Sequence, residues 1–143
     1  MKAVPRHSTS HIVLLQFLTF NGYFYYWCGR SGGEINKAIG ARKAPSAWWF
    51  IIPFGGYYWC WRYGVAIEEW SKSIIRRDEV ILVYFVAINA WLIVPFLYHI
   101  FHFSGFDRIL AFLVDFVLSA IVLIIGHGLF CRYIQERINQ RVI

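Results

Sequence analysis

Residues 109–131 read ILAFLVDFVLSAIVLIIGHGLFC, a run in which Asp115 is the one formal charge. A bilayer core about 30 Å thick is crossed by ~20 mostly apolar helical residues, and this run meets that requirement. Residues 80–103 meet it as well and contain no Asp, Glu, Lys or Arg. We therefore predict two strong membrane-embedded helices, at about 80–103 and 108–131.

The composition of the whole chain supports a membrane protein. Of its 143 residues, 59% are hydrophobic and 15% are charged, whereas about a quarter of a typical soluble domain is charged. The net charge of +6 is compatible with nucleic acid or with an anionic membrane surface. Because the basic residues lie between long apolar runs and form no stripe, we expect a lipid bilayer as the partner and no nucleic acid.

Two further apolar segments, at about 11–28 and 46–62, are interrupted. The first contains Asn21-Gly22, and the second contains Pro53, Gly55 and Gly56. Such breaks free backbone groups that lipid cannot satisfy. The segments are therefore either kinked spanning helices or re-entrant elements. With an amphipathic C-terminal helix at 132–143, the expected fold is one all-α membrane domain over 1–143 with four embedded segments.

The two interrupted segments resemble each other at an interval of 34 residues. Phe20-Asn21-Gly22-Tyr23 corresponds to Phe54-Gly55-Gly56-Tyr57, Trp27 to Trp61, and Glu34 to Glu68. Membrane proteins often place a site between such repeats. We interpret the repeat as a docking surface or a pathway, for which the candidate residues are Gly22, Tyr23, Trp27, Glu34, Gly56, Tyr57, Trp61 and Glu68.

The distribution of basic residues orients the chain, because they favour the cytoplasmic side. If all four segments span, nine basic residues lie inside and five outside; if the first two re-enter, thirteen lie inside and Arg108 alone lies outside. Both arrangements put the N- and C-termini in the cytoplasm. The expected location is the bacterial inner (cytoplasmic) membrane.

Short aromatic and polar motifs resemble those of a known family. The pattern F-x-G-Y-x-x-Y-W precedes Glu34-Ile35-Asn36, and residues 133–139 read YIQERIN. These motifs are similar to those of a prokaryotic family of small multi-pass membrane proteins that is defined by a domain of unknown function. The resemblance implies an α-helical membrane bundle and brings no activity or catalytic residues.

Few polar residues inside the predicted membrane segments are candidates for chemistry. Asp115, Asn89 and His127 are the intramembrane candidates, and a buried charge such as Asp115 is either a relay step or a packing contact. His99 and His102, at i and i+3, share a helix face and are weak metal candidates, since no acid or cysteine lies at helical spacing beside them. Arg132, Arg137 and Arg141 are candidates for contact with anionic headgroups.

The motif inventory favours a protein that works by association. No phosphate-binding glycine loop, G-x-S-x-G elbow, HExxH helix or CxxC pair is present. We expect a non-enzymatic accessory, anchoring or scaffold subunit of a membrane complex, with no cofactor and with a protein partner or a second copy bound. Alternatives are a homo-oligomeric transporter or channel using Asp115, and a lipid-modifying enzyme using the histidines.

Overall fold

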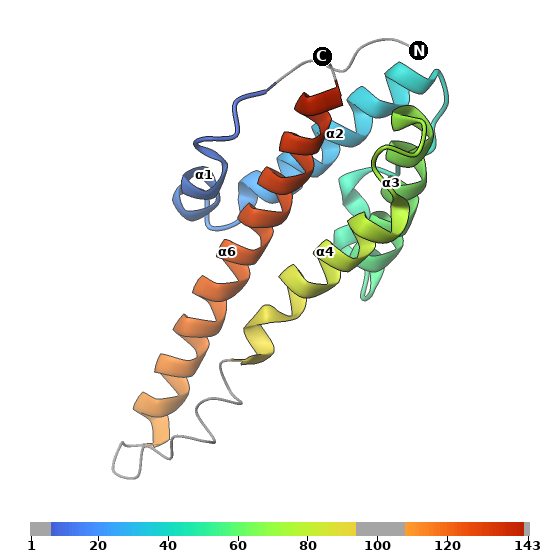
Figure 1. The fold of residues 1–143 in the computed structure, drawn as a ribbon. Coiled ribbons are helices and arrows are strands. Elements are labelled where there is room, and N and C mark those ends of the chain that lie inside the picture. The colour runs from blue at the N-terminus through green and yellow to red at the C-terminus, as the bar shows by residue number, and fades with distance from the viewer. Residues whose placement is uncertain (1–6, 94–107, 142–143) are drawn as a thin grey trace.

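The computed structural model describes residues 7–93 and 108–141, and every regular element in these ranges is a helix. The predicted all-helical class is therefore confirmed. The elements, labelled in Figure 1, are α1 (Ile12–Leu18), α2 (Gly22–Ile39), the 3-10 helix η1 (Ala47–Ile51), α3 (Gly55–Ser71), α4 (Arg77–Asn89), the 3-10 helix η2 (Ala90–Leu92) and α6 (Arg108–Arg141).

Helix α6 is the longest element and contains the apolar run 109–131. It has 34 residues, which at 1.5 Å per residue is about 51 Å, more than the ~30 Å of a bilayer core. Its part Phe112–Arg141 is the one helix in the described residues that is long and apolar enough to cross a membrane. Residues 132–141 of the predicted C-terminal helix at 132–143 are helical and continue α6 without a break.

The predicted segments 11–28 and 46–62 are not single helices. Phe20 and Asn21, with φ of 46° and 71°, and Phe54, with φ of 61°, adopt the left-handed conformation. A right-handed helix does not continue through such residues, and Pro53 has no N–H to donate. The chain therefore makes a turn between α1 and α2 and a second turn between η1 and α3.

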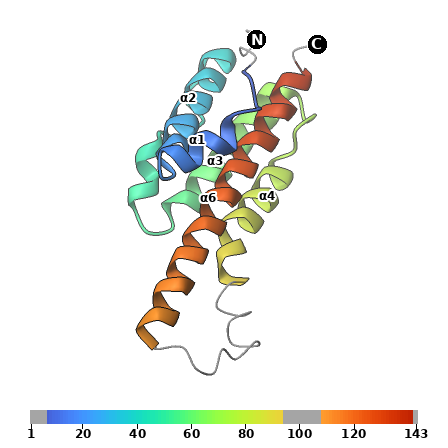
Figure 2. The same cartoon turned by 90° about the vertical axis from the view of Figure 1, so that its left-hand side faces the viewer.

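The helices are arranged with their polar ends together. In both Figure 1 and Figure 2, the C-terminal ends of α2, α3 and α6 lie at one end of the molecule, and the two turns face the opposite way. The N-terminal half of α6 extends beyond both turns. At the turns, the apolar side chains of Phe20 and Phe54 are 89% and 83% exposed.

Two glycines let neighbouring helices approach α6 closely. A Cβ atom on Gly126 would lie 2.4 Å from the carbonyl oxygen of Ala87 on α4, and one on Gly128 would lie 3.2 Å from the Cα of Val13 on α1. Small residues allow such approach in membrane helix packing. The core continues from this point toward the polar end and combines aliphatic side chains with large aromatic ones, among them Trp27, Trp59 and Tyr63.

The buried faces of α2 and α3 correspond at an interval of 32 residues. Residues 25–35 read YYWCGRSGGEI and residues 57–67 read YYWCWRYGVAI, with seven identical letters. Trp27 and Trp59 are 4% and 0% exposed, whereas Trp61 is 45% exposed. The interval of 34 pairs a buried tryptophan with an exposed one, so that register is wrong for the two helices.

Candidate functional site

A polar cavity of about 210 Å³ lies where α1 and α2 meet the end of α6. Tyr23, Trp27 and Glu34 line it, and they recur along α2 at i, i+4 and i+11, which places them on one helix face. Its other polar lining residues are His7, Ser8, Arg30, Ser31 and Gln135. The structure thus brings together three of the predicted repeat residues.

The charged groups of this cavity neutralise one another. The Nε atom of Arg30 donates to Glu34 at 3.0 Å, and Nε2 of His7 lies 3.1 Å from the same carboxylate. Arg30 also donates to the Tyr26 hydroxyl at 3.3 Å, and the hydrogen bonds to Glu34 and Tyr26 raise the pKa of Arg30. These contacts tie the N-terminal segment to α2.

A chain of side-chain amides connects the cavity to the end of α6. The indole N–H of Trp27 donates to Gln135 at 3.3 Å, Gln135 donates to Asn139 at 3.2 Å, and Asn139 donates to the carbonyl of His7 at 2.8 Å. Buried polar groups that are satisfied in this way specify one arrangement of helices. We interpret the network as positioning the helices, because its described members include no nucleophile paired with a base.

His127 joins α6 to the α1–α2 turn. Its ring stacks on Phe24 with centroids 4.0 Å apart, and its Nδ1 lies 2.9 Å from the Asn21 side-chain nitrogen. Its Nε2 and the Oε1 atom of Gln16 are buried and have no hydrogen-bond partner in the described part of the chain. His127 is therefore a packing and hydrogen-bonding residue of the core.

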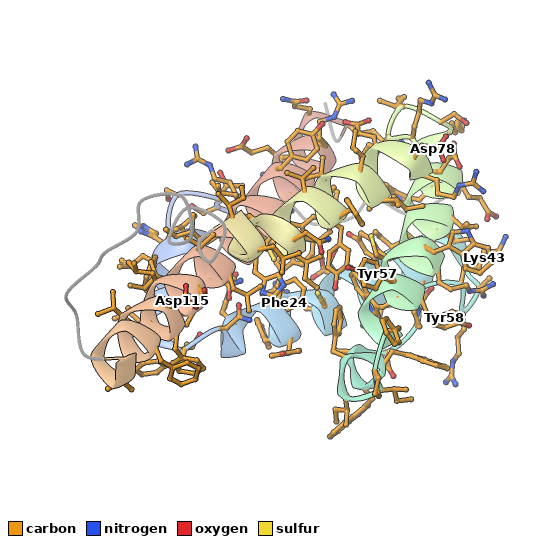
Figure 3. All side chains as sticks on the ribbon, turned by 90° about the horizontal axis from the view of Figure 1, so that it is seen from below. Phe24, Lys43, Tyr57, Tyr58, Asp78 and Asp115 are labelled. Atoms are coloured by element: carbon orange, nitrogen blue, oxygen red, sulfur yellow. The ribbon has the colours of Figure 1, made fainter. Side chains whose placement is uncertain are left out.

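The structure does not bring the three intramembrane candidates into one site. Asn89 donates to the Tyr57 hydroxyl at 3.2 Å and to the Phe85 carbonyl at 2.7 Å. Asp115 lies twelve residues before His127 on α6, about 18 Å along the helix axis. Figure 3 shows Asp115 on the part of α6 remote from Tyr57. One Asp115 oxygen is occluded and unpaired among the described residues.

The second set of predicted repeat residues separates into different roles. A Cβ atom on Gly56 would lie 2.4 Å from the Tyr84 hydroxyl, so this glycine allows α3 to pack on α4. Trp61 is exposed, and Glu68 makes no ion pair within the described ranges. A Cβ atom on Gly22 would lie 3.6 Å from the Cβ of Thr19, at the turn between α1 and α2.

The three arginines predicted to meet headgroups have protein partners. Arg132 donates to Glu136 at 2.8 Å, Arg137 donates to Glu79 at 3.1 Å, and Arg141 lies over the Trp70 ring at 4.4 Å and donates to the Trp70 carbonyl. Helical spacing indicates the Arg132–Glu136 pair at i and i+4, but it does not reveal Glu79 and Trp70, which lie on other helices. Their guanidinium groups therefore already interact with other protein groups in the folded chain.

Glu79 is the acidic centre of the contact between α4 and α6. Tyr133 and Arg137 both donate to it. Burial raises the pKa of Glu79, but the two hydrogen bonds and the positive charge of Arg137 outweigh burial and leave that pKa below its ordinary value. The ionised form is thus favoured in the fold.

The metal candidates His99 and His102 lie outside the described residues, as does the end of the predicted segment 80–103. Within the described ranges, no group of three or more His, Cys, Asp or Glu side chains is placed to hold a metal ion.

Sequence reasoning missed several residues that the structure brings into contact. Ser31 and Tyr63 form a buried hydrogen bond of 2.6 Å between α2 and α3, and the Gln16 amide donates to the Cys131 sulfur at 3.8 Å. The signal for the first pair is the 32-residue correspondence, which aligns Ser31 with Tyr63. No pattern along the chain indicates the Gln16 contact.

Comparison of the chain with protein-family models, with curated proteins and with solved structures found no match. The family resemblance drawn from the motifs therefore stays a prediction.

Proposed function

We propose that this chain is an integral protein of the bacterial inner membrane with two spanning segments and two re-entrant elements. In this proposal α6 and the segment 80–103 span, while α1–α2 and η1–α3 enter and leave on the cytoplasmic side. The supporting observation is that the ends of α2, α3 and α6 share one end of the molecule, with exposed Phe20 and Phe54 at the turns. Exposed apolar side chains at such tips suit an apolar surrounding better than water.

Within the membrane we propose that the protein acts as an accessory or anchoring subunit. Support comes from an apolar groove of about 620 Å³ between α4 and α6. Ala87, Ala90 and Gly126 line it, and the exposed side chains of Leu82 and Leu129 form its sides. Small residues between larger apolar ones suit the close approach of another apolar helix. The proposed occupant is a transmembrane helix of a partner subunit.

Purification in a mild detergent tests the accessory role. We expect the full chain to elute as an assembly larger than itself, and Ala90→Leu, which fills the groove, to convert it to the lone chain. Ile121→Phe changes an exposed apolar residue of α6 that does not line the groove, and should leave the assembly intact. A monodisperse monomer of the unmodified chain, or equal behaviour of both variants, would contradict the proposal.

A transporter or channel is the second candidate. The Asp115 oxygen that is occluded and unpaired among the described residues favours it, because a carboxylate at membrane depth is costly and usually marks a functional site. Flux of protons or cations into liposomes that contain the full chain would support this role if Asp115→Asn abolished it. Liposomes without flux would remove it.

A further inference from the structure

A second and larger cavity, of about 860 Å³, lies on the outer side of α2, under the loop that connects α2 to η1. Four cationic side chains line it: Lys37, Arg42, Lys43 and Arg62. Gly33 lines this open hollow, and a Cβ atom on it would meet no atom within 4 Å. This volume falls in the usual range for small-ligand sites, which is about 300–1,000 Å³.

Three of these four cations are not neutralised by the fold. Lys43 pairs with Glu69, whereas Lys37, Arg42 and Arg62 form no ion pair with any residue in the described ranges. No acidic side chain lines the cavity. Cations that line one hollow without an acidic counter-charge give it a positive potential, which attracts anions.

The correspondence of α2 and α3 shows how Arg62 is left without an acid. At the interval of 32, Arg30 aligns with Arg62 and Glu34 aligns with Ala66. Arg30 is paired by Glu34 one helical turn later, with Nε to Oε1 at 3.0 Å. Arg62 has Ala66 at that position, so its guanidinium has no such partner.

Asn36 makes three of the hydrogen bonds that hold the loop over this cavity in place. The Asn36 oxygen accepts the backbone N–H groups of Lys43 and Ala44, each at 2.8 Å, and its side-chain nitrogen donates to the Ala44 carbonyl at 2.8 Å. Gly32 allows the close packing of this loop on α2, with a Cβ position 3.4 Å from that of Ala44. The cavity is therefore formed before any ligand binds, which lowers the entropic cost of binding.

Aromatic side chains border the cavity. Tyr58 lines it and packs against Trp49 with ring centroids 4.3 Å apart, and the neighbouring Trp48 is exposed. Figure 3 shows Lys43 and Tyr58 at the same edge of the molecule, away from Phe24 and Asp115. Tyr and Trp favour the headgroup level of a bilayer, and basic pockets on the cytoplasmic side bind anionic headgroups.

We propose that this cavity binds the phosphate headgroup of an anionic phospholipid, with Lys37, Arg42 and Arg62 contacting the phosphate and Tyr58 bordering it. The inference rests on the proposed membrane embedding and goes beyond it, because it assigns a ligand class to a specific site. It does not depend on a partner in the α4–α6 groove.

The test is thermal unfolding of the full chain purified in dodecyl maltoside, with phosphatidylglycerol, phosphatidylcholine or inorganic phosphate added at equal concentration. A ligand that binds the native state alone raises the midpoint, and we expect phosphatidylglycerol to raise it by about 5 °C and the other two by less than about 1 °C. Lys37→Gln/Arg62→Gln should lose that shift. Gly33→Leu, which fills the cavity and keeps every charge, should lose it too.

The matched control is Arg76→Gln, which removes an exposed cation at the same end of the molecule and should keep the full shift. A shift that survives in both Lys37→Gln/Arg62→Gln and Gly33→Leu would overturn the proposal. An equal shift with inorganic phosphate would overturn the assignment of a lipid as the ligand, because free phosphate would then bind equally well. A chain that stays folded and monomeric without detergent would instead refute the membrane embedding, so the two failures are distinguishable.

Discussion

Gly126 of α6 lies so close to Ala87 of α4 that a Cβ atom on the glycine would be 2.4 Å from the alanine carbonyl oxygen. The two helices thus meet backbone to backbone at this point. Since α4 and α6 are the described parts of the two strong apolar segments, this contact fixes how the proposed spanning pair is packed.

Gly126→Ala should destabilise the protein by about 1–3 kcal/mol, because the obstructing atoms are backbone atoms that move only with their helix. Thermal or denaturant unfolding in detergent measures the change. Gly33→Ala is the matched control: its Cβ position is open, and replacing a helical glycine should stabilise by about 0.5–1 kcal/mol. Equal effects of the two substitutions would contradict the close packing of α4 on α6.

Ser31→Ala should cost about 1–3 kcal/mol, because it leaves the buried Tyr63 hydroxyl without its partner at 2.6 Å. Tyr63→Phe removes the other partner of the same hydrogen bond. If the bond forms, the double variant should be less destabilised than the sum of the two single variants. Additive effects would mean that α2 and α3 are not joined there.

Asn21 combines a left-handed φ of 71° with the contact to His127. Asn21→Gly loses the side-chain contact, but glycine tolerates the left-handed conformation. Asn21→Ala loses the same contact and also places a strained residue in that conformation. Alanine in this conformation costs about 1–2 kcal/mol more than glycine, and we expect that difference between the free energies of unfolding of the two variants. Equal stability of the variants would indicate that the chain does not turn at Asn21.

The Glu79 contact predicts an acid-sensitive fold. The pKa of Glu79 is lowered in the native state, so its stabilisation is present above its ordinary pKa of about 4.5 and is lost as pH falls through the lower native value. Glu79→Gln should reduce stability at pH 7 by about 1 kcal/mol or less, since the side chain is partly exposed. It should also reduce the loss of stability between pH 5 and pH 3.

Asp78→Asn is the control for this pH experiment. Asp78 is adjacent in sequence, is largely exposed and contacts Arg76 and Arg77 alone among its described neighbours. Its pH profile of stability should match that of the unmodified chain. A Glu79→Gln profile that also matched it would contradict the role of the contact with Arg137.

The sequence allowed prediction of the helical class and of the longest apolar helix, because length and apolarity are local properties of residues 108–131. It also indicated the two breaks, at Asn21-Gly22 and at Pro53-Phe54, because glycine and proline mark them. We predicted the wrong register for α2 and α3, although seven letters agree between residues 25–35 and 57–67 at the interval of 32. Trp27 and Trp61 match only in residue type. Which face of each helix is buried depends on the elements that pack against it.

The binding residues were harder to predict for the same reason. On α6 considered alone, Arg137 and Arg141 share a helix face at i and i+4, and Arg132 lies on another face. The partners of Arg137 and Arg141, Glu79 and Trp70, come from α4 and α3 and are known only once the helices are packed. Conversely, Lys37 and Arg62 lie 25 residues apart in sequence and line one cavity through folding.

The account depends on α1–α2 and η1–α3 entering and leaving the membrane on one side, and single-cysteine labelling with a membrane-impermeant maleimide tests this most directly. Cys28, Cys60 and Cys131 are buried, so background labelling should be low. Ala41→Cys and Ser73→Cys place thiols after α2 and after α3. We predict that both react in inside-out vesicles and that neither reacts in intact cells; labelling of Ala41→Cys from outside and of Ser73→Cys from inside would contradict the account.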